Sequence, residues 1–141
     1  MAYNYTNSTG TKRTTKVWKD LNLNFTKHPT TNDIVKLEGV NAVKRSVRNL
    51  INLNHYEKPF HPEIGSGVRD LLFENMTPFV ANTLARKIED TINNFEPRAL
   101  LAGVEVFPDF DQNAYSVTVE FYLQNAPAEL VDLSFTLERI R

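Results

Sequence analysis

The sequence predicts an α+β fold in which two amphipathic helices pack on a three-stranded antiparallel meander sheet. The first observation is a change of hydrophobic period, from steps of three and four residues before residue 95 to alternation after it. The second is the close spacing of the last three alternating segments, which favours antiparallel pairing of neighbours. The third is that a small sheet with one apolar face needs a cover, which the two helices supply.

Composition places the chain among ordinary folded domains. With 141 residues, of which 41% are hydrophobic and 11% aromatic, it can build its own core. The absence of cysteine excludes a disulfide framework, a zinc knuckle and a thiol nucleophile. No apolar run approaches the ~18–20 residues of a membrane span, and the first ten residues lack the apolar core of a signal peptide. We therefore expect a soluble protein with no membrane partner.

Charge is divided unevenly along the chain. Residues 1–58 contain ten Lys or Arg and four Asp or Glu, whereas residues 59–141 contain six and thirteen. Such asymmetry suggests a head-to-tail neighbour or a polyanion, although two unrelated solvated faces are the commoner explanation. The basic residues belong to no recognisable reading motif, so nucleic acid is not an expected partner.

The N-terminal quarter predicts an arm, a short strand and a helix. Residues 1–16 are polar and without apolar period, so we expect a flexible arm, followed by one α+β domain over 17–141. Residues 17–25 alternate partially and predict a short strand that ends at His28-Pro29. Residues 31–33 are candidate caps for a helical pattern over 34–53, whose secure part is 40–52.

The middle of the chain predicts a loop and a second helix. Two prolines and two glycines break residues 55–67, where Tyr56, Phe60 and Ile64 are expected to anchor the loop to the core. A helical turn over 68–73 should follow. Thr77-Pro78 is a typical helix start and predicts a helix over about 78–94.

The C-terminal third predicts strands over 101–107, 114–123 and 130–140, with turns at 109–113 and 125–128. In the middle strand, one face carries Tyr115, Val117, Val119, Phe121 and Leu123. In the last strand, the corresponding face carries Val131, Leu133, Phe135 and Leu137. A three-stranded sheet leaves two edges, to which a strand of another chain can add unless charges such as Glu138, Arg139 and Arg141 guard it.

Side chains that could carry catalysis or metal binding occur in no specific pattern. No Gly-x-Ser-x-Gly elbow surrounds any of the serines Ser46, Ser66, Ser116 and Ser134. The loop holds two histidines near two glutamates, a spacing too loose to predict a metal site: His55, Glu57, His61 and Glu63. No cofactor or metal is predicted.

Carboxylates for glycoside cleavage remain an open alternative. Such chemistry needs two groups roughly 5–10 Å apart, one of them with a raised pKa. Glu63, Glu74 and Glu96 are candidates by their position near the helix-loop region. Neither their separation nor their burial can be read from the sequence.

Glu96-Pro97-Arg98 follows the second helix and is more informative. Proline ends the helix and holds Glu96 extended, and Arg98 suits a helix C-terminus. A local ion pair of little energetic weight is one interpretation. The other is a rigid charged plug for a partner that offers its own Arg and carboxylate.

Three segments together resemble the gene-25-like baseplate wedge family of contractile phage tails, also labelled lysozyme-like, which has a counterpart in type VI secretion baseplates. They are residues 59–67 (PFHPEIGSG), residues 72–78 (LFENMTP) and Glu96-Pro97-Arg98. They occur in the family's order, and the resemblance runs from about Val43 to the C-terminus.

The resemblance implies a structural subunit of the virion tail baseplate, assembled in the host cytoplasm, and not an enzyme. Glu96, Pro97 and Arg98 would dock on the helical core bundle of the larger wedge subunits. The last strand, with Val131, Leu133, Phe135 and Leu137, would start sheath assembly by strand exchange with the tail sheath protein. The resemblance leaves open whether the arm reaches the sheath, the tube or another wedge protein. The alternatives are a peptidoglycan-degrading tail lysozyme and a regulator with the same superfamily fold.

Overall fold

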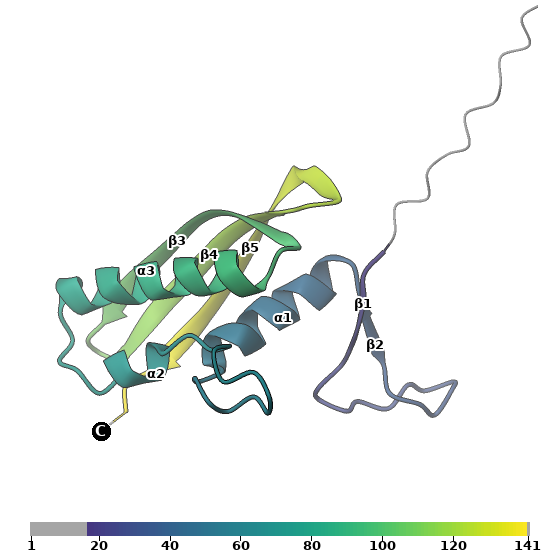
Figure 1. Cartoon of the computed structure of the whole chain (residues 1–141), viewed down its shortest axis with the longest axis horizontal. Coiled ribbons are helices and arrows are strands. Elements are labelled where there is room, and N and C mark those ends of the chain that lie inside the picture. The colour runs from purple at the N-terminus through teal and green to yellow at the C-terminus, as the bar shows by residue number, and fades with distance from the viewer. Residues whose placement is uncertain (1–16, 141) are drawn as a thin grey trace, which may run out of the picture.

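The computed structural model describes residues 17–140, and the predicted arm lies outside this range (Figure 1). The described chain is α+β, as the sequence predicts. It contains, in order, β1 (Lys19–Leu21), β2 (Lys36–Glu38), α1 (Val40–Asn52), α2 (Val68–Leu71), α3 (Pro78–Phe95), β3 (Ala99–Asp109), β4 (Ala114–Leu123) and β5 (Ala126–Glu138). Among these described residues, no helix is both long and apolar enough to cross a bilayer.

The strands β3, β4 and β5 form an antiparallel sheet in that order, as the meander prediction requires. The strand β4 has the predicted bounds, and all five residues of its predicted apolar face are buried. The strand β5 begins at Ala126 instead of 130, because the connection from β4 is a tight turn at Gln124-Asn125. The predicted turn over 125–128 is therefore largely strand.

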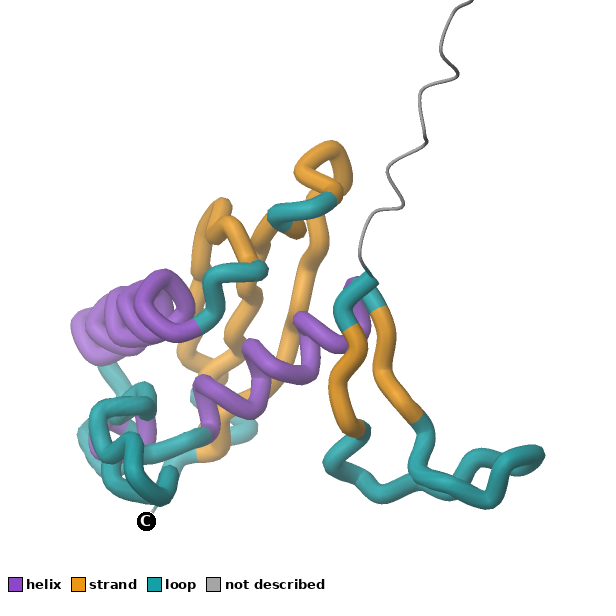
Figure 2. Tube along the Cα trace, turned by 45° about the vertical axis from the view of Figure 1, so that its right-hand side comes forward, coloured by secondary structure: helices purple, strands orange, loops and turns teal. Residues whose placement is uncertain are grey.

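Helices α1 and α3 cover the same face of the sheet (Figures 1 and 2). Thr77 caps α3 by accepting a hydrogen bond from the backbone N–H of Val80, and Pro78 occupies the first turn. The helix α1 begins after Gly39, whose φ of 58° favours glycine, and has the predicted bounds. Each helix buries one apolar stripe. In α1 the stripe is Val43, Val47 and Ile51. In α3 it is Ala81, Leu84, Ile88 and Ile92.

The opposite face of the sheet is not covered by any described helix (Figure 2). Its central positions are acidic: Glu120 on β4 is directly opposite Asp132 on β5, and Glu105 is exposed on β3. A row of larger side chains crosses one end of this face: Leu100, Tyr122 and Leu130. We call this surface, defined by its three acids and this row, the open face.

A small hairpin precedes α1 and is absent from the sequence prediction. Strands β1 and β2 pair so that Lys19 is opposite Glu38, and these two side chains form an exposed ion pair at 2.9 Å. The predicted strand over 17–25 is thus only three residues long, and the candidate caps at 31–33 lie in the hairpin loop. The hairpin stands at the N-terminal end of α1, away from the sheet (Figure 2).

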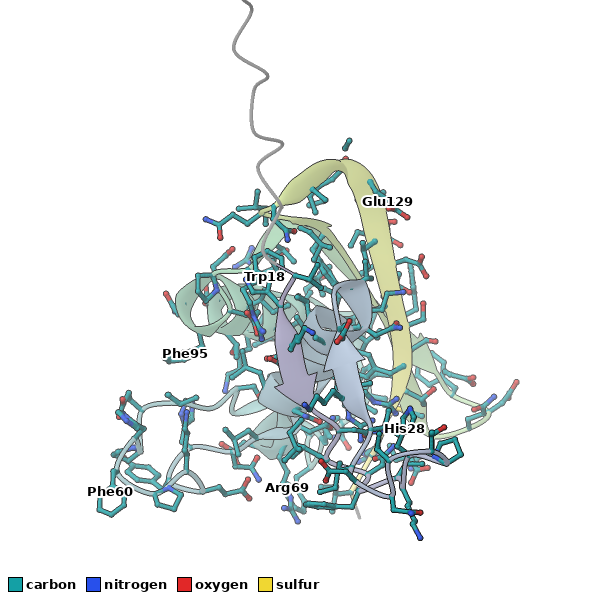
Figure 3. All side chains as sticks on the ribbon, turned by 90° about the vertical axis from the view of Figure 1, so that its right-hand side faces the viewer. Trp18, His28, Phe60, Arg69, Phe95 and Glu129 are labelled. Atoms are coloured by element: carbon teal, nitrogen blue, oxygen red, sulfur yellow. The ribbon has the colours of Figure 1, made fainter. Side chains whose placement is uncertain are left out.

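The loop between α1 and α2 is tied down by hydrogen bonds. Ser66 is buried, and its hydroxyl donates to the carbonyl of Ile51 at 2.6 Å. The prediction that aromatic residues anchor this loop is wrong, because Tyr56 is 85% exposed and Phe60 is 97% exposed. Figure 3 shows Phe60 at the tip of the loop, pointing into solvent. Ile64 is half-buried.

Candidate functional site

The Glu96-Pro97-Arg98 turn joins the end of α3 to the start of β3. The backbone N–H of Glu96 still donates to the carbonyl of Ile92 at 2.9 Å, so Glu96 closes the last helical turn. Its φ of −125° and ψ of 77° leave the helical region, as expected for a residue before proline. Proline therefore places the two charged side chains on either side of a rigid step.

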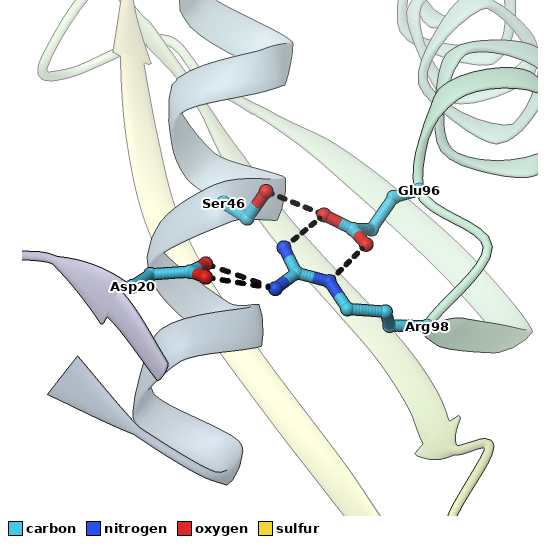
Figure 4. A network of polar contacts seen from close by, with 4 residues as sticks. All are labelled: Asp20, Ser46, Glu96 and Arg98. Carbon is cyan, nitrogen blue, oxygen red and sulfur yellow. Dashed lines mark hydrogen bonds and ion pairs between the residues drawn. The ribbon is translucent and has the colours of Figure 1, made fainter. Parts of the chain in front are cut away.

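Arg98 and Glu96 form a two-pronged ion pair (Figure 4). The guanidinium donates from Nε to Glu96 Oε1 at 2.7 Å and from Nη2 to Oε2 at 2.8 Å. The remaining nitrogen, Nη1, donates to both oxygens of Asp20 at 3.0 and 3.1 Å, and the hydroxyl of Ser46 donates to Glu96 Oε2. We call Asp20, Ser46, Glu96 and Arg98 the Glu96 cluster.

The cluster draws on four separate parts of the fold. Asp20 comes from β1, Ser46 from α1, Glu96 from the end of α3, and Arg98 directly precedes β3. The side chain of Glu96 is only 4% exposed, that of Arg98 is 21% exposed and that of Asp20 is 34% exposed. The exposed fraction of the side chain thus increases from Glu96 to Arg98 to Asp20, so Asp20 lies at the solvent-facing side of the cluster.

Both central groups are ionised at neutral pH. Burial opposes ionisation of Glu96, but hydrogen bonds from Arg98 and Ser46 outweigh it and lower the pKa of its carboxyl. Hydrogen bonding to Glu96 raises the pKa of Arg98, although burial acts in the other direction. The centre of the cluster is therefore a carboxylate paired with a guanidinium.

The carboxylates that were candidates for glycoside cleavage lie in different surroundings. Glu63 is exposed and contacts His61 Nδ1 at 3.1 Å, and Glu74 is also exposed. Glu63 lines a pocket with His55, Lys87 and Asp90, and neither Glu74 nor Glu96 is among the residues that line this pocket. The lowered pKa of Glu96 is opposite to what a general acid requires.

The other candidate side chains have local roles. Glu57 accepts hydrogen bonds from the backbone and the side chain of Asn54 at 2.9 and 2.7 Å. Ser66 binds backbone carbonyls, and Ser46 belongs to the Glu96 cluster. Within residues 17–140, no group of three or more potential ligands has the geometry to hold a metal ion.

The four apolar residues of β5 that were assigned to a sheath contact face the protein's own core. Val131, Phe135 and Leu137 are buried, and Leu133 is partly buried against the same core. The strand β5 is an edge of the sheet, and no other described strand pairs with its outer side. Its accessible feature is therefore the outer backbone edge and not these apolar side chains.

Sequence reasoning missed Asp20 and Ser46. Asp20 is 78 residues from Arg98, and Ser46 is 50 residues from Glu96. Asp20 lies in the short strand predicted over 17–25 and Ser46 in the first predicted helix, and no sequence pattern places either residue beside the Glu96-Pro97-Arg98 turn. A pairing over such a separation depends on the whole fold.

The family model for baseplate wedge protein gp25 matches residues 37–128. Baseplate wedge protein gp25 of Enterobacteria phage T4 is 33% identical over 105 residues, which is 74% of this chain and 80% of that protein. The chain belongs to the gp25 family of baseplate wedge proteins.

Solved structures agree with membership of the gp25 family. A chain in the six-fold symmetrised baseplate of the anti-feeding prophage has a TM-score of 0.60 and 26% identity, covering 89% of this chain and 88% of its own. A candidate tail lysozyme from Geobacter sulfurreducens has a TM-score of 0.65 over 70% of this chain and 89% of its own. Its identity is 16%, so it supports the fold alone. Asp20 and all of the hairpin except Leu37 and Glu38 lie before the residues that the gp25 family model matches.

Proposed function

We propose that this chain is a structural subunit of a contractile-tail baseplate wedge, which docks through the Glu96 cluster on the helical core of larger wedge subunits. The observation that carries the proposal is the two-pronged pair between Arg98 and Glu96, held from outside by Asp20 and Ser46. A charged group fixed by four segments loses little conformational entropy when a partner binds. Family membership supports the baseplate setting in the virion tail.

Docking can be tested by co-expression with the helical wedge subunits, followed by size-exclusion chromatography with light scattering. We expect Arg98→Lys to weaken co-elution strongly, because an ammonium group cannot reproduce the two-pronged contact or hold Asp20 at the same time. Arg86→Lys, on the exposed side of α3, is the matched control and should co-elute like the wild type. Undiminished co-elution of Arg98→Lys would show that the cluster serves folding alone.

We also propose that the outer edge of β5 starts sheath assembly by accepting a strand of the tail sheath protein. Along β5, alternate residues direct backbone hydrogen-bonding groups to the outer side, which no described strand uses. Such an edge adds an extended segment through backbone hydrogen bonds.

Amide hydrogen exchange can test this second contact. Alternate amides of β5 should exchange rapidly in the isolated protein and slowly once sheath subunits have assembled on it. The amides of β4, which is paired on both sides, should be slow in both states and provide the internal control. If the outward amides of β5 stay fast in the assembled state, strand exchange at this edge is wrong.

The function as a tail lysozyme is not supported at this site. The buried carboxylate is ionised and paired with Arg98, so it has no proton to donate. This alternative can be tested by a hydrolysis assay on purified cell wall, with hen lysozyme as a positive control. Hydrolysis by the purified protein would reopen the alternative.

A further inference from the structure

Two hollows lie side by side along α1. One has a volume of about 240 Å³ and is bordered by Asp20, Leu21 and Leu23 of the hairpin. The other has a volume of about 460 Å³, and its apolar lining comes from Leu50, Leu53, Ile64 and Phe95. Ser46 and Asn49 line both, so the two hollows meet at the middle of α1.

The two hollows together make one groove along a single face of α1. Its lining includes Ala42, Ser46, Asn49 and Leu53, which are separated by four, three and four residues and therefore lie in one row. From Ala42 to Leu53 the row is about 16 Å long, since each helical residue rises about 1.5 Å. We call this surface the α1 groove.

The α1 groove is mainly apolar at both ends, although Glu57 and Lys58 also line the loop end, and it is polar where the two hollows meet, at Ser46 and Asn49. At the hairpin end, Leu21 and Leu23 are each 51% exposed, which leaves much of their apolar surface in water. Ser46, whose hydroxyl donates to Glu96, lies where the two hollows meet, and Asp20, the more exposed of the two acids of the cluster, lines the hollow at the hairpin end. Arg45 lines the hairpin end as well, and its guanidinium donates to Asn24.

We propose that the α1 groove binds one amphipathic helix of a wedge subunit, about three turns long, with apolar side chains at both ends and a hydrogen-bond donor opposite Asp20. The length of the groove fits such a helix, whose apolar residues recur every three or four positions. The proposal rests on the proposed docking function, because two members of the Glu96 cluster, Asp20 and Ser46, line the groove. It adds the hairpin and the loop end of α1 to the contact.

The groove can be blocked without changing the cluster. Asn49→Trp places an indole where the two hollows meet, whereas Asn41→Trp places the same side chain on the exposed first turn of α1, outside the groove. We expect Asn49→Trp to weaken binding to the helical wedge subunits about tenfold or more, as for a blocked hot spot. Asn41→Trp should bind like the wild type, and both variants should keep the wild-type circular dichroism.

The role of Asp20 can be separated by a conservative change. Asp20→Asn keeps the shape but removes the charge that accepts a donor, so we expect binding about tenfold weaker. Glu38→Gln makes the same change on the same hairpin, at the exposed ion pair with Lys19, and should have little effect.

The outcomes distinguish the groove from docking itself. If the wild type and Asn49→Trp bind equally well while Arg98→Lys does not, docking stands and the groove proposal is wrong. If the wild type does not bind the helical subunits at all, both proposals are wrong. If the free protein forms a dimer that Asn49→Trp dissociates, the occupant is a second copy of the chain, and the proposed helix is overturned.

Discussion

Replacing Arg98 by alanine should lower the free energy of unfolding by about 3 kcal/mol, because it leaves a buried carboxylate without its main partner. Glu96 is only 4% exposed and would retain the hydroxyl of Ser46 as a donor. Urea unfolding of the wild type and Arg98→Ala measures the difference. Arg86→Ala, an exposed change on α3, should cost less than about 0.5 kcal/mol and serves as the control.

The pH dependence identifies the cause of this loss. In the wild type, folding lowers the pKa of Glu96. The ionised carboxylate therefore stabilises the fold fully at any pH above the pKa that Glu96 has in the unfolded chain. This stabilisation is lost as the pH falls through the lower pKa that Glu96 has in the folded protein. In Arg98→Ala, burial without the guanidinium should raise that pKa instead. The stability difference between the two proteins should therefore shrink between about pH 7 and pH 4. A difference that is constant with pH would contradict this account and assign the loss to packing.

Replacing Gly65 by alanine should disrupt the loop between α1 and α2. An added Cβ would lie 2.5 Å from the backbone N of His55 and 2.6 Å from the backbone C of Asn54, and neither atom can move aside as a flexible side chain can. The clash should lower the free energy of unfolding by about 1–3 kcal/mol. It should also strain the neighbouring hydrogen bond from Ser66 N to Leu53 O, which is 2.9 Å long.

Gly103→Ala is the matched control. Gly103 lies at the irregularity in the pairing of β3 with β4, and a Cβ there meets no atom within 4 Å. Its effect should stay within about 0.5 kcal/mol. Equal thermal and urea stability of Gly65→Ala and the wild type would show that the loop can shift to accept the methyl group.

The regular core could be predicted from the sequence because its signals are local. The bounds of α1 and β4 agree with the prediction, since periodic apolar residues define the first and strict alternation defines the second. Thr77-Pro78 likewise marks the start of α3. Thr77 accepts a hydrogen bond from a free N–H of the first turn, and Pro78 has the φ angle of a helix and no N–H that would need a partner there. These features depend on neighbours within one or two helical turns.

The hairpin and the outer half of the Glu96 cluster could not be predicted in this way. Each strand of the hairpin has only three residues, which is too short for an alternating pattern to be told apart from the apolar pattern of the helix that follows. The contact between Asp20 and Arg98 requires β1 to lie beside the end of α3, which no local rule specifies. The exposed positions of Tyr56 and Phe60 were missed because aromatic residues usually contribute to a core.

The open face has a consequence for the behaviour of the free protein. Two copies that approached each other with their sheets stacked would bring Glu105, Glu120 and Asp132 of each molecule together, and like charges facing each other repel. Stacking is a route by which exposed sheets associate wrongly. We therefore expect the acids to oppose stacking of separate molecules, with a strength that decreases as salt is added. The same repulsion does not act on the backbone edge of β5, which is the edge proposed to accept a strand of the sheath protein.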